Sequence, residues 1–185
     1  MTILRTKRFL LRPIESQDAP RFAVLCNDID IARNTARVPH PYGLADAEAF
    51  VKAIKEAFET GQEYAFAVCR EGEIIACAGT MPAEKRSCEI GYWVGAEYRR
   101  NGVATEIAAA VTQFSFDQLG AETVTAGHFT DNPASGRVLT KLGFLPTGKI
   151  TQTMSRGRGC AADTVRLTLS HAAFRNSDDV RAIID

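Results

Sequence analysis

The amino-acid sequence predicts one α/β domain with a mixed, mostly antiparallel sheet of about six or seven strands and helices on both faces. Strand-like apolar runs occur before, between and after segments whose apolar residues recur every three or four positions. One strand–helix–strand unit near the centre has the order of a parallel crossover. The 185 residues are enough for one domain with a full core and short for two. We therefore expect a single domain over residues 1–175 and a tail over 176–185.

Composition narrows the class of protein. Hydrophobic residues make up 45% and charged residues 24%, which is ordinary for a soluble globular protein. Basic and acidic residues number 22 each, and this balance argues against a general nucleic-acid binder. We expect no signal peptide, because the N-terminal charges are not followed by a long apolar run, and no apolar run is long enough to span a membrane. Five scattered cysteines without a C-x-x-C pair suggest neither a metal site nor disulfides, so we expect a cytoplasmic protein with reduced thiols.

The N-terminal third predicts a strand and three helices. A proline stops the strand, and Ser16 has a hydroxyl suited to cap the next helix. Two prolines forbid regular structure at 38–43 and make that segment a loop. Apolar residues then recur at spacings of three and four until Gly61 ends an amphipathic helix. The expected elements are a strand at 9–13 and helices at 16–26, 29–34 and 44–58.

The rest of the chain predicts six strands and two helices. Glu71-Gly72 is a hairpin signal between the first two strands, and the third pairs back antiparallel. The polar, basic stretch from Ser155 to Gly159 joins the last two strands, either as a solvated tip or as a contact for an acidic acceptor. The expected strands lie at 64–70, 73–81, 87–94, 122–129, 144–153 and 161–169, and the helices at about 103–119 and at 133–142.

The stretch from 88 to 106 predicts an anion-binding turn. A strand leads through the loop 95–101 into a helix, whose first N–H groups lack intrahelical partners. Arg99 and Arg100 add positive charge to the helix dipole, unless they form only a solvated turn. Gly102 lets the backbone approach a ligand closely. The pattern is neither a Walker A loop nor a complete dinucleotide-binding fingerprint, and it favours a phosphate or pyrophosphate.

Two motifs resemble those of a known family. Arg99-x-x-Gly102-x-Ala104 resembles the acetyl-CoA pyrophosphate loop of the GNAT N-acetyltransferase superfamily. Asn132-x-x-Ser135, followed by Gly-Phe at 143–144, resembles a second GNAT segment, closest to the Rim-type ribosomal-protein N-terminal acetyltransferases. The opening strand at 8–13 is similar to that branch as well. The motifs occur in the family's order, about 30 residues apart, and together they are a specific signal. The resemblance covers nearly the whole chain.

The resemblance implies a GNAT fold with a splayed central strand pair and acetyl-CoA as the cosubstrate. Asn132 would bond the pantetheine arm, although with the following proline it is also typical of a plain helix cap. A backbone N–H near Val94 would stabilise the thioester oxygen. The implied CoA-binding residues are Trp93, Val94, Arg99, Arg100, Asn101, Gly102, Val103, Ala104, Thr105, Asn132 and Ser135.

Two residues are candidates for catalysis. Glu89 lies on the strand that feeds the phosphate loop and is the candidate base, acting through a water; the alternative is a surface or salt-bridged glutamate. Much of the superfamily carries a tyrosine acid where this chain has Leu139, so Ser135 is the remaining hydroxyl for the departing thiolate. Cys88 alternates with Glu89 along the strand, so it should face away from the site.

The resulting functional hypothesis is an acetyl-CoA-dependent N-acetyltransferase that transfers acetyl directly to a primary amine. The acceptor would be a protein N-terminal α-amine or a small amine. An α-amine loses its proton more easily than a lysine side chain, because its pKa is about 8 against about 10.4 for lysine. A non-catalytic acyl-CoA-binding module and a nucleotide-binding regulator are the alternatives. A homodimer is a further possibility, and neither a membrane nor a metal is expected as a partner.

Overall fold

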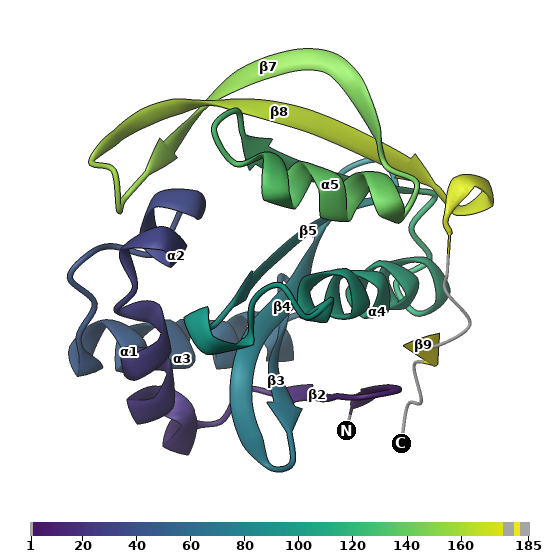
Figure 1. Ribbon diagram of the computed structural model, residues 1–185. Helices are drawn as coiled ribbons and strands as arrows, with labels where there is room; N and C mark the ends of the chain where they lie inside the picture. The colour runs from purple at the N-terminus through teal and green to yellow at the C-terminus, as the bar shows by residue number, and fades with distance from the viewer. Residues whose placement is uncertain (1, 176–179, 182–185) are drawn as a thin grey trace.

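The computed structural model describes residues 2–175 and 180–181 and contains one sheet with helices on both faces (Figure 1). The five α-helices in this part of the chain are α1 Ala19–Cys26, α2 Ile29–Asn34, α3 Leu44–Glu59, α4 Val103–Asp117 and α5 Pro133–Lys141. The strands are β1 Leu4–Thr6, β2 Leu10–Pro13, β3 Tyr64–Arg70, β4 Glu73–Ala83, β5 Ser87–Val94, β6 Thr123–Phe129, β7 Leu145–Ser155, β8 Cys160–Ser170 and β9 Val180–Arg181. None of the described helices is both long and apolar enough to cross a membrane.

The sheet has nine strands in the order β7-β8-β6-β5-β4-β3-β2-β1-β9. Its pairs are antiparallel except for β5 with β6, the predicted crossover around α4. The predicted mixed sheet is therefore confirmed, with two strands more than the sequence indicated. The additional strands are β1, which is too short to show an alternating pattern, and β9, which pairs with β1. Because β9 lies at 180–181, part of the expected tail joins the sheet, and 176–179 and 182–185 lie outside the described residues.

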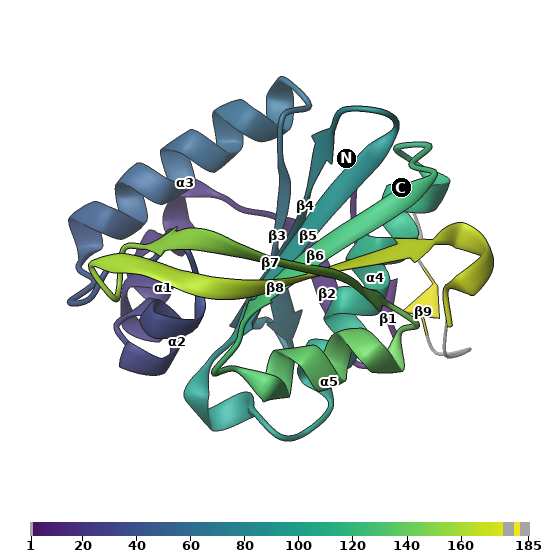
Figure 2. The same ribbon diagram turned by 90° about the horizontal axis from the view of Figure 1, so that it is seen from above.

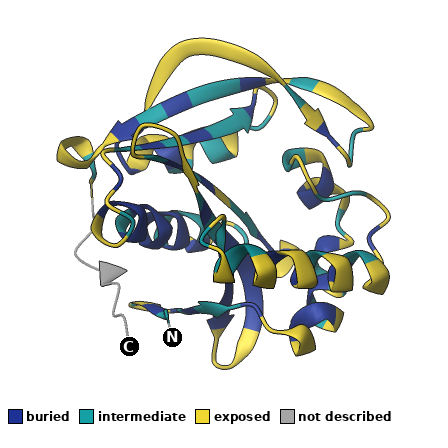
Figure 3. Cartoon of the chain, turned by 180° about the vertical axis from the view of Figure 1, so that it is seen from behind, coloured by how far each residue is buried: buried dark blue, intermediate teal, exposed yellow. Residues whose placement is uncertain are grey.

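The two faces of the sheet carry separate apolar clusters. Helices α4 and α5 cover one face, and α1 to α3 lie against the other (Figure 2). Helix α4 is the more deeply buried and is dark blue along most of its length in Figure 3, whereas α3 exposes its outer side. Cys88 is buried under α4, while Trp93 packs edge-on against Phe22 at 5.6 Å on the other face. Alternation along β5 thus separates Cys88 from Glu89, as the sequence predicts.

The central strand pair is splayed. Strands β5 and β6 are paired only from Ser87 to Glu89 and from Thr123 to Thr125. Beyond this point β5 remains paired with β4 up to Val94, and β6 remains paired with β8 up to Phe129. The two halves of the sheet therefore separate, and their facing edges leave a gap that begins beside Glu89. This confirms the splayed pair that the family resemblance implies.

The first helical turn differs from the prediction. Ser16 does not cap the helix; residues 16–18 form a short 3₁₀ turn capped from Glu15, and the carboxylate of Asp18 accepts from the N–H of Glu15 at 2.8 Å. Arg12 donates to both oxygens of Asp18 at 2.7 and 2.8 Å. Burial opposes ionisation of Asp18, but these hydrogen bonds outweigh it and lower its pKa. A buried ion pair, rather than a serine hydroxyl, thus fixes the start of α1.

We expect Asp18→Asn to lower the free energy of unfolding by about 3 kcal/mol at pH 7, since it leaves the Arg12 guanidinium without its anion. A carboxylate whose pKa is lowered by folding stabilises the fold above its unfolded pKa of about 3.9, and this contribution is lost as pH falls through the folded pKa. Urea unfolding at several pH values checks this. The difference in unfolding free energy between wild type and variant should decrease below pH 4. A difference that does not depend on pH would contradict the role given to the Asp18 carboxylate.

Candidate active site

One large cleft opens at the splayed strands. Its volume is about 1430 Å³. The N-termini of α4 and α5 line one end, the separated edges of β5 and β6 form its middle, and α2, α3 and the loop after α2 line the other end. Arg99, Gly102 and Ala104 of the first motif and Asn132 and Ser135 of the second therefore line one cleft. Asn101 and the Gly-Phe pair at 143–144 are not among its lining residues.

The N-terminus of α4 has the geometry of an anion-binding turn. Gly102 caps the helix with φ of +74°, a left-handed conformation that glycine adopts most easily. No side chain caps this turn, so the N–H groups of residues 103–105 have no acceptor among the residues that the structure describes. Val103, Ala104 and Thr105 line the cleft. These donors and the positive end of the helix dipole suit a phosphate.

The two arginines of the turn differ in their surroundings. Arg99 donates to the carbonyl of Val94 at 3.0 Å and forms an ion pair with Asp28, so its charge is already balanced. Arg100 is exposed, has φ of +64° and makes no side-chain hydrogen bond or ion pair within the described part of the chain. Of the two charges expected at the anion site, only that of Arg100 is available to a ligand.

Arg8 supports the same turn from outside the cleft. Its guanidinium donates to the carbonyl of Asn101 at 2.8 Å and to Glu106 at 2.6 Å, and its main-chain N–H also donates to Glu106. Arg8 thus ties the chain start to Asn101 and to the first turn of α4, 93 and 98 residues further on. Sequence reasoning used Arg8 only as part of a family likeness, because no local pattern signals a contact of this range.

Asn132 and Ser135 begin α5 at the same end of the cleft. The Oδ1 of Asn132 accepts from the N–H of Ser135 at 3.3 Å, so the capping role that the sequence left open is present. The Nδ2 of Asn132 makes no hydrogen bond among the described residues and remains available to a ligand. The hydroxyl of Ser135 lies 2.9 Å from that of Tyr92 on β5, a cleft residue that is not among the site residues expected from the sequence.

Glu89 lies where the strand pair opens. Both of its carboxylate oxygens accept from Arg166 of β8, at 2.9 and 2.8 Å. These hydrogen bonds raise the pKa of Arg166. Gly127 makes room for the guanidinium, since a Cβ there would lie 2.8 Å from Arg166 Nη1. Glu89 keeps 37% of its side chain exposed, so it is both salt-bridged, as the alternative interpretation held, and accessible from the cleft.

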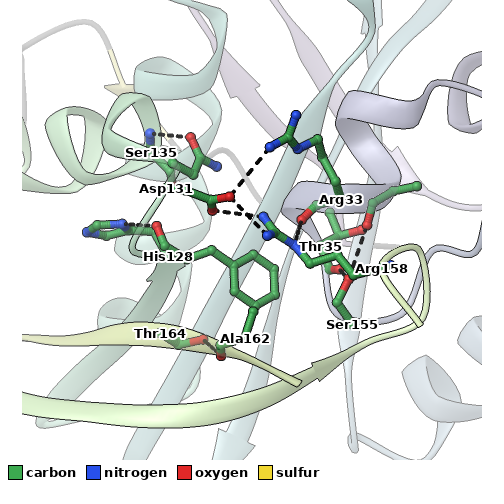
Figure 4. Close-up of polar contacts among 12 residues, drawn as sticks. Arg33, Thr35, His128, Asp131, Ser135, Ser155, Arg158, Ala162 and Thr164 are labelled. Carbon is green, nitrogen blue, oxygen red and sulfur yellow. Dashed lines mark hydrogen bonds and ion pairs between the residues drawn. The ribbon is translucent and has the colours of Figure 1, made fainter. Parts of the chain in front are cut away.

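The hairpin tip between β7 and β8 is docked onto α2 (Figure 4). Arg158 donates to both oxygens of Asp131 at 2.9 and 2.8 Å, donates to the carbonyl of Arg33, and lies over the ring of Phe129. Ser155 Oγ donates to the carbonyl of Thr35 at 3.0 Å. The tip is therefore anchored through Ser155 and Arg158 rather than fully solvated, and it joins the α2 end of the cleft to the β6–α5 turn.

We expect Arg158→Met to loosen this junction, because it removes a bidentate charge-assisted contact while keeping a long apolar stem. Unfolding free energy should fall by about 1 kcal/mol, and hydrogen exchange of residues 31–36 should accelerate. Arg156→Met is the matched control, since Arg156 is exposed and its side chain makes no hydrogen bond or ion pair to a described residue. Equal exchange rates in the two variants would contradict the docking role.

The cleft in the split sheet thus joins a helix N-terminus that suits a phosphate to a carboxylate and a hydroxyl. The chain belongs to the GNAT acetyltransferase family: the family model described as acetyltransferase (GNAT) domain matches residues 8–145. The protein is accordingly an acetyltransferase.

Relatives and solved structures agree with this membership. The chain is 34% identical over 163 residues to the uncharacterized N-acetyltransferase YoaA of Bacillus subtilis, covering 82% of this chain and 88% of YoaA. Its fold is similar to that of Mycobacterium smegmatis RimJ in complex with CoA-disulfide, with a TM-score of 0.80, 18% identity, and coverage of 95% and 88%. It is also similar to RimL, a ribosomal L7/L12 α-N-protein acetyltransferase in complex with coenzyme A, with a TM-score of 0.80, 15% identity, and coverage of 92% and 99%.

Proposed function

We propose that the protein transfers the acetyl group of acetyl-CoA directly to the primary amine of an acceptor. The observation that carries the proposal is the single cleft, opened by the splayed strands, that the start of α4, Glu89 and Ser135 all line. A phosphate-bearing donor bound at one end would present its reactive group at the opening, and the acceptor would approach from the α2 and α3 end.

The residues present fit acetyl-CoA as the donor. The N–H groups of 103–105 and the free guanidinium of Arg100 suit a pyrophosphate. Arg137 and Lys141, both exposed on α5 and lining the same cleft, add positive charge for a further phosphate. The amide of Asn132 and the separated edge of β5 near Val94 offer hydrogen bonds to the amide-containing arm of the donor.

Glu89 is the proposed base. An amine must be neutral to attack, and a carboxylate acting through a water can take its proton. Arg166 occupies one lone pair of each Glu89 oxygen, and the others can accept from a water. The Arg166 contact also fixes the direction in which the carboxylate points, toward the start of the strand gap. The balanced transfer forms a C–N bond, breaks the C–S bond, and leaves the electron pair on sulfur.

The acceptor end of the cleft suits a chain terminus. It is an open groove: Ala45, Ala49 and Ala53 of α3 line it and are exposed, and Phe50 is half-buried beside them. Small side chains leave width for an extended peptide, whereas a small free amine would be held better in a closed pocket. We therefore propose a protein or peptide N-terminal α-amine as the acceptor.

An acceptor panel tests the proposal by following thiol release from acetyl-CoA. We expect kcat/KM for peptides with free N-termini to exceed that for small amines by about tenfold, through added contacts in the groove. The same peptides with blocked N-termini are the control. Activity on small amines alone would contradict the peptide acceptor, and thiol release without acetylated product would contradict transfer to an amine.

A further inference from the structure

Two hydroxyl groups bridge the gap between the splayed strands. Tyr92 comes from β5 on one side, and Ser135 comes from α5, which follows β6 on the other. Their oxygens lie 2.9 Å apart, and both residues line the cleft. The main-chain pairing of β5 and β6 ends at Glu89 and Thr125. The contact between the two hydroxyl groups therefore links the two halves of the sheet beyond the point where backbone hydrogen bonds link them.

The phenol of Tyr92 has little choice of acceptor. Burial raises the pKa of Tyr92 to about 12, so the group keeps its proton at physiological pH. A buried O–H needs an acceptor. The two acceptors within reach among the described residues are Ser135 Oγ at 2.9 Å and the Ser135 carbonyl at 3.5 Å. The shorter distance is near the preferred value for O–H···O bonds. Either hydroxyl can donate at this distance, and in the arrangement that we infer Tyr92 donates to Ser135 Oγ.

This direction orients the serine. If Ser135 Oγ accepts from Tyr92, its own proton must point elsewhere. The N–H of Ser135 is already held by Asn132 at 3.3 Å, which fixes the backbone that carries the hydroxyl. No other described side chain accepts from Ser135 Oγ, and the residue lines the cleft. Its O–H is therefore available to an acceptor atom within the opening.

We propose that Tyr92 is a positioning residue that holds the Ser135 hydroxyl as a hydrogen-bond donor to the sulfur of bound CoA. The inference rests on the proposed function, because it requires CoA in the cleft. As the C–S bond breaks, the electron pair remains on sulfur and Ser135 stabilises that charge. Tyr92 keeps its proton throughout, and the proton of the attacking amine leaves through the water on Glu89.

This arrangement accounts for a departure from the family pattern. The helix position where much of the superfamily has a tyrosine is Leu139, which is buried and has no ionisable group. Here Tyr92 of strand β5 contacts Ser135, which lies four residues before Leu139 on α5, and in this proposal it acts through that serine. A thiolate needs stabilisation more than protonation, since thiols have pKa values of about 8.5, and a phenol with a raised pKa is suited to hydrogen bonding rather than to proton transfer.

The test measures ionisation of the bound thiol and needs no acceptor. The affinity for CoA is measured by calorimetry from pH 6 to 10 for wild type, Tyr92→Phe, Ser135→Ala and the double variant. Dethio-CoA, which lacks the sulfur, is the control ligand. We expect the wild-type preference for the thiolate form of CoA to fall about tenfold in each single variant, with no further loss in the double variant and no change for dethio-CoA.

The possible results separate this proposal from the proposed function. If the wild type binds CoA and Tyr92→Phe keeps the same preference for the thiolate form of CoA, the positioning role of Tyr92 is overturned. The proposed transferase function would then stand. A loss that is equal for CoA and dethio-CoA would overturn the positioning role too, since it would indicate a structural effect. Absence of CoA binding in the wild type would overturn both. With an acceptor, Tyr92→Phe should lower kcat about tenfold while the KM for acetyl-CoA stays unchanged.

Discussion

Replacing Gly102 with tryptophan is expected to weaken acetyl-CoA binding by about 100-fold or more, which places it below calorimetric detection. Two effects combine. The side chain would stand at the N-terminus of α4, where the N–H groups of 103–105 line the cleft without acceptors among the described residues. The backbone φ of +74° also disfavours any side chain, so the turn would rearrange. Both effects remove the donors that a pyrophosphate would use.

The matched control is Gly72→Trp. Gly72 has φ of +86° and lies in the β3–β4 turn away from the cleft, where an added Cβ would meet no described atom within 4 Å. It therefore carries similar backbone strain without touching the anion turn. Gly72→Trp should bind acetyl-CoA as wild type does, and both variants should melt cooperatively. Equal affinities in the two variants would contradict the assignment of the pyrophosphate site.

Replacing Glu89 with glutamine is expected to lower kcat by about 100-fold, the lower range for loss of a general base. Glutamine keeps the shape and can still accept one hydrogen bond from Arg166, but it cannot take a proton. The affinity for acetyl-CoA should not change, because Glu89 lies away from the start of α4. Steady-state kinetics with the best peptide acceptor, together with calorimetry, check both expectations.

Glu122→Gln is the control for this change. Glu122 also forms an ion pair with an arginine, Arg86, but it is exposed and does not line the cleft. Its kcat should match that of wild type. If Glu89→Gln keeps more than about a third of the wild-type kcat, the base is another group, and Glu89 serves to hold Arg166 over β6.

The sequence alone determined the order of the elements apart from β1 and β9, and the position of the glycine turn that precedes α4. Apolar spacing, prolines and glycines act within a few residues, so they predicted α3 and the strands from β3 to β5 closely. The turn at 99–104 was likewise visible, because a helix start and its glycine are adjacent in the chain. The same local logic failed at Ser16, where a buried ion pair between Arg12 and Asp18 replaced the expected cap.

Only the tertiary structure decided which partners the site residues have. Arg166 meets Glu89 across 77 residues, Tyr92 meets Ser135 across 43, and Arg99 meets Asp28 across 71. Local patterns say which face a side chain occupies, but they carry no information on which distant group packs against it. The direction in which each functional group points follows from such contacts. They arise from the split of the sheet and the folding of β8 and α5 around it, which is a property of the whole domain.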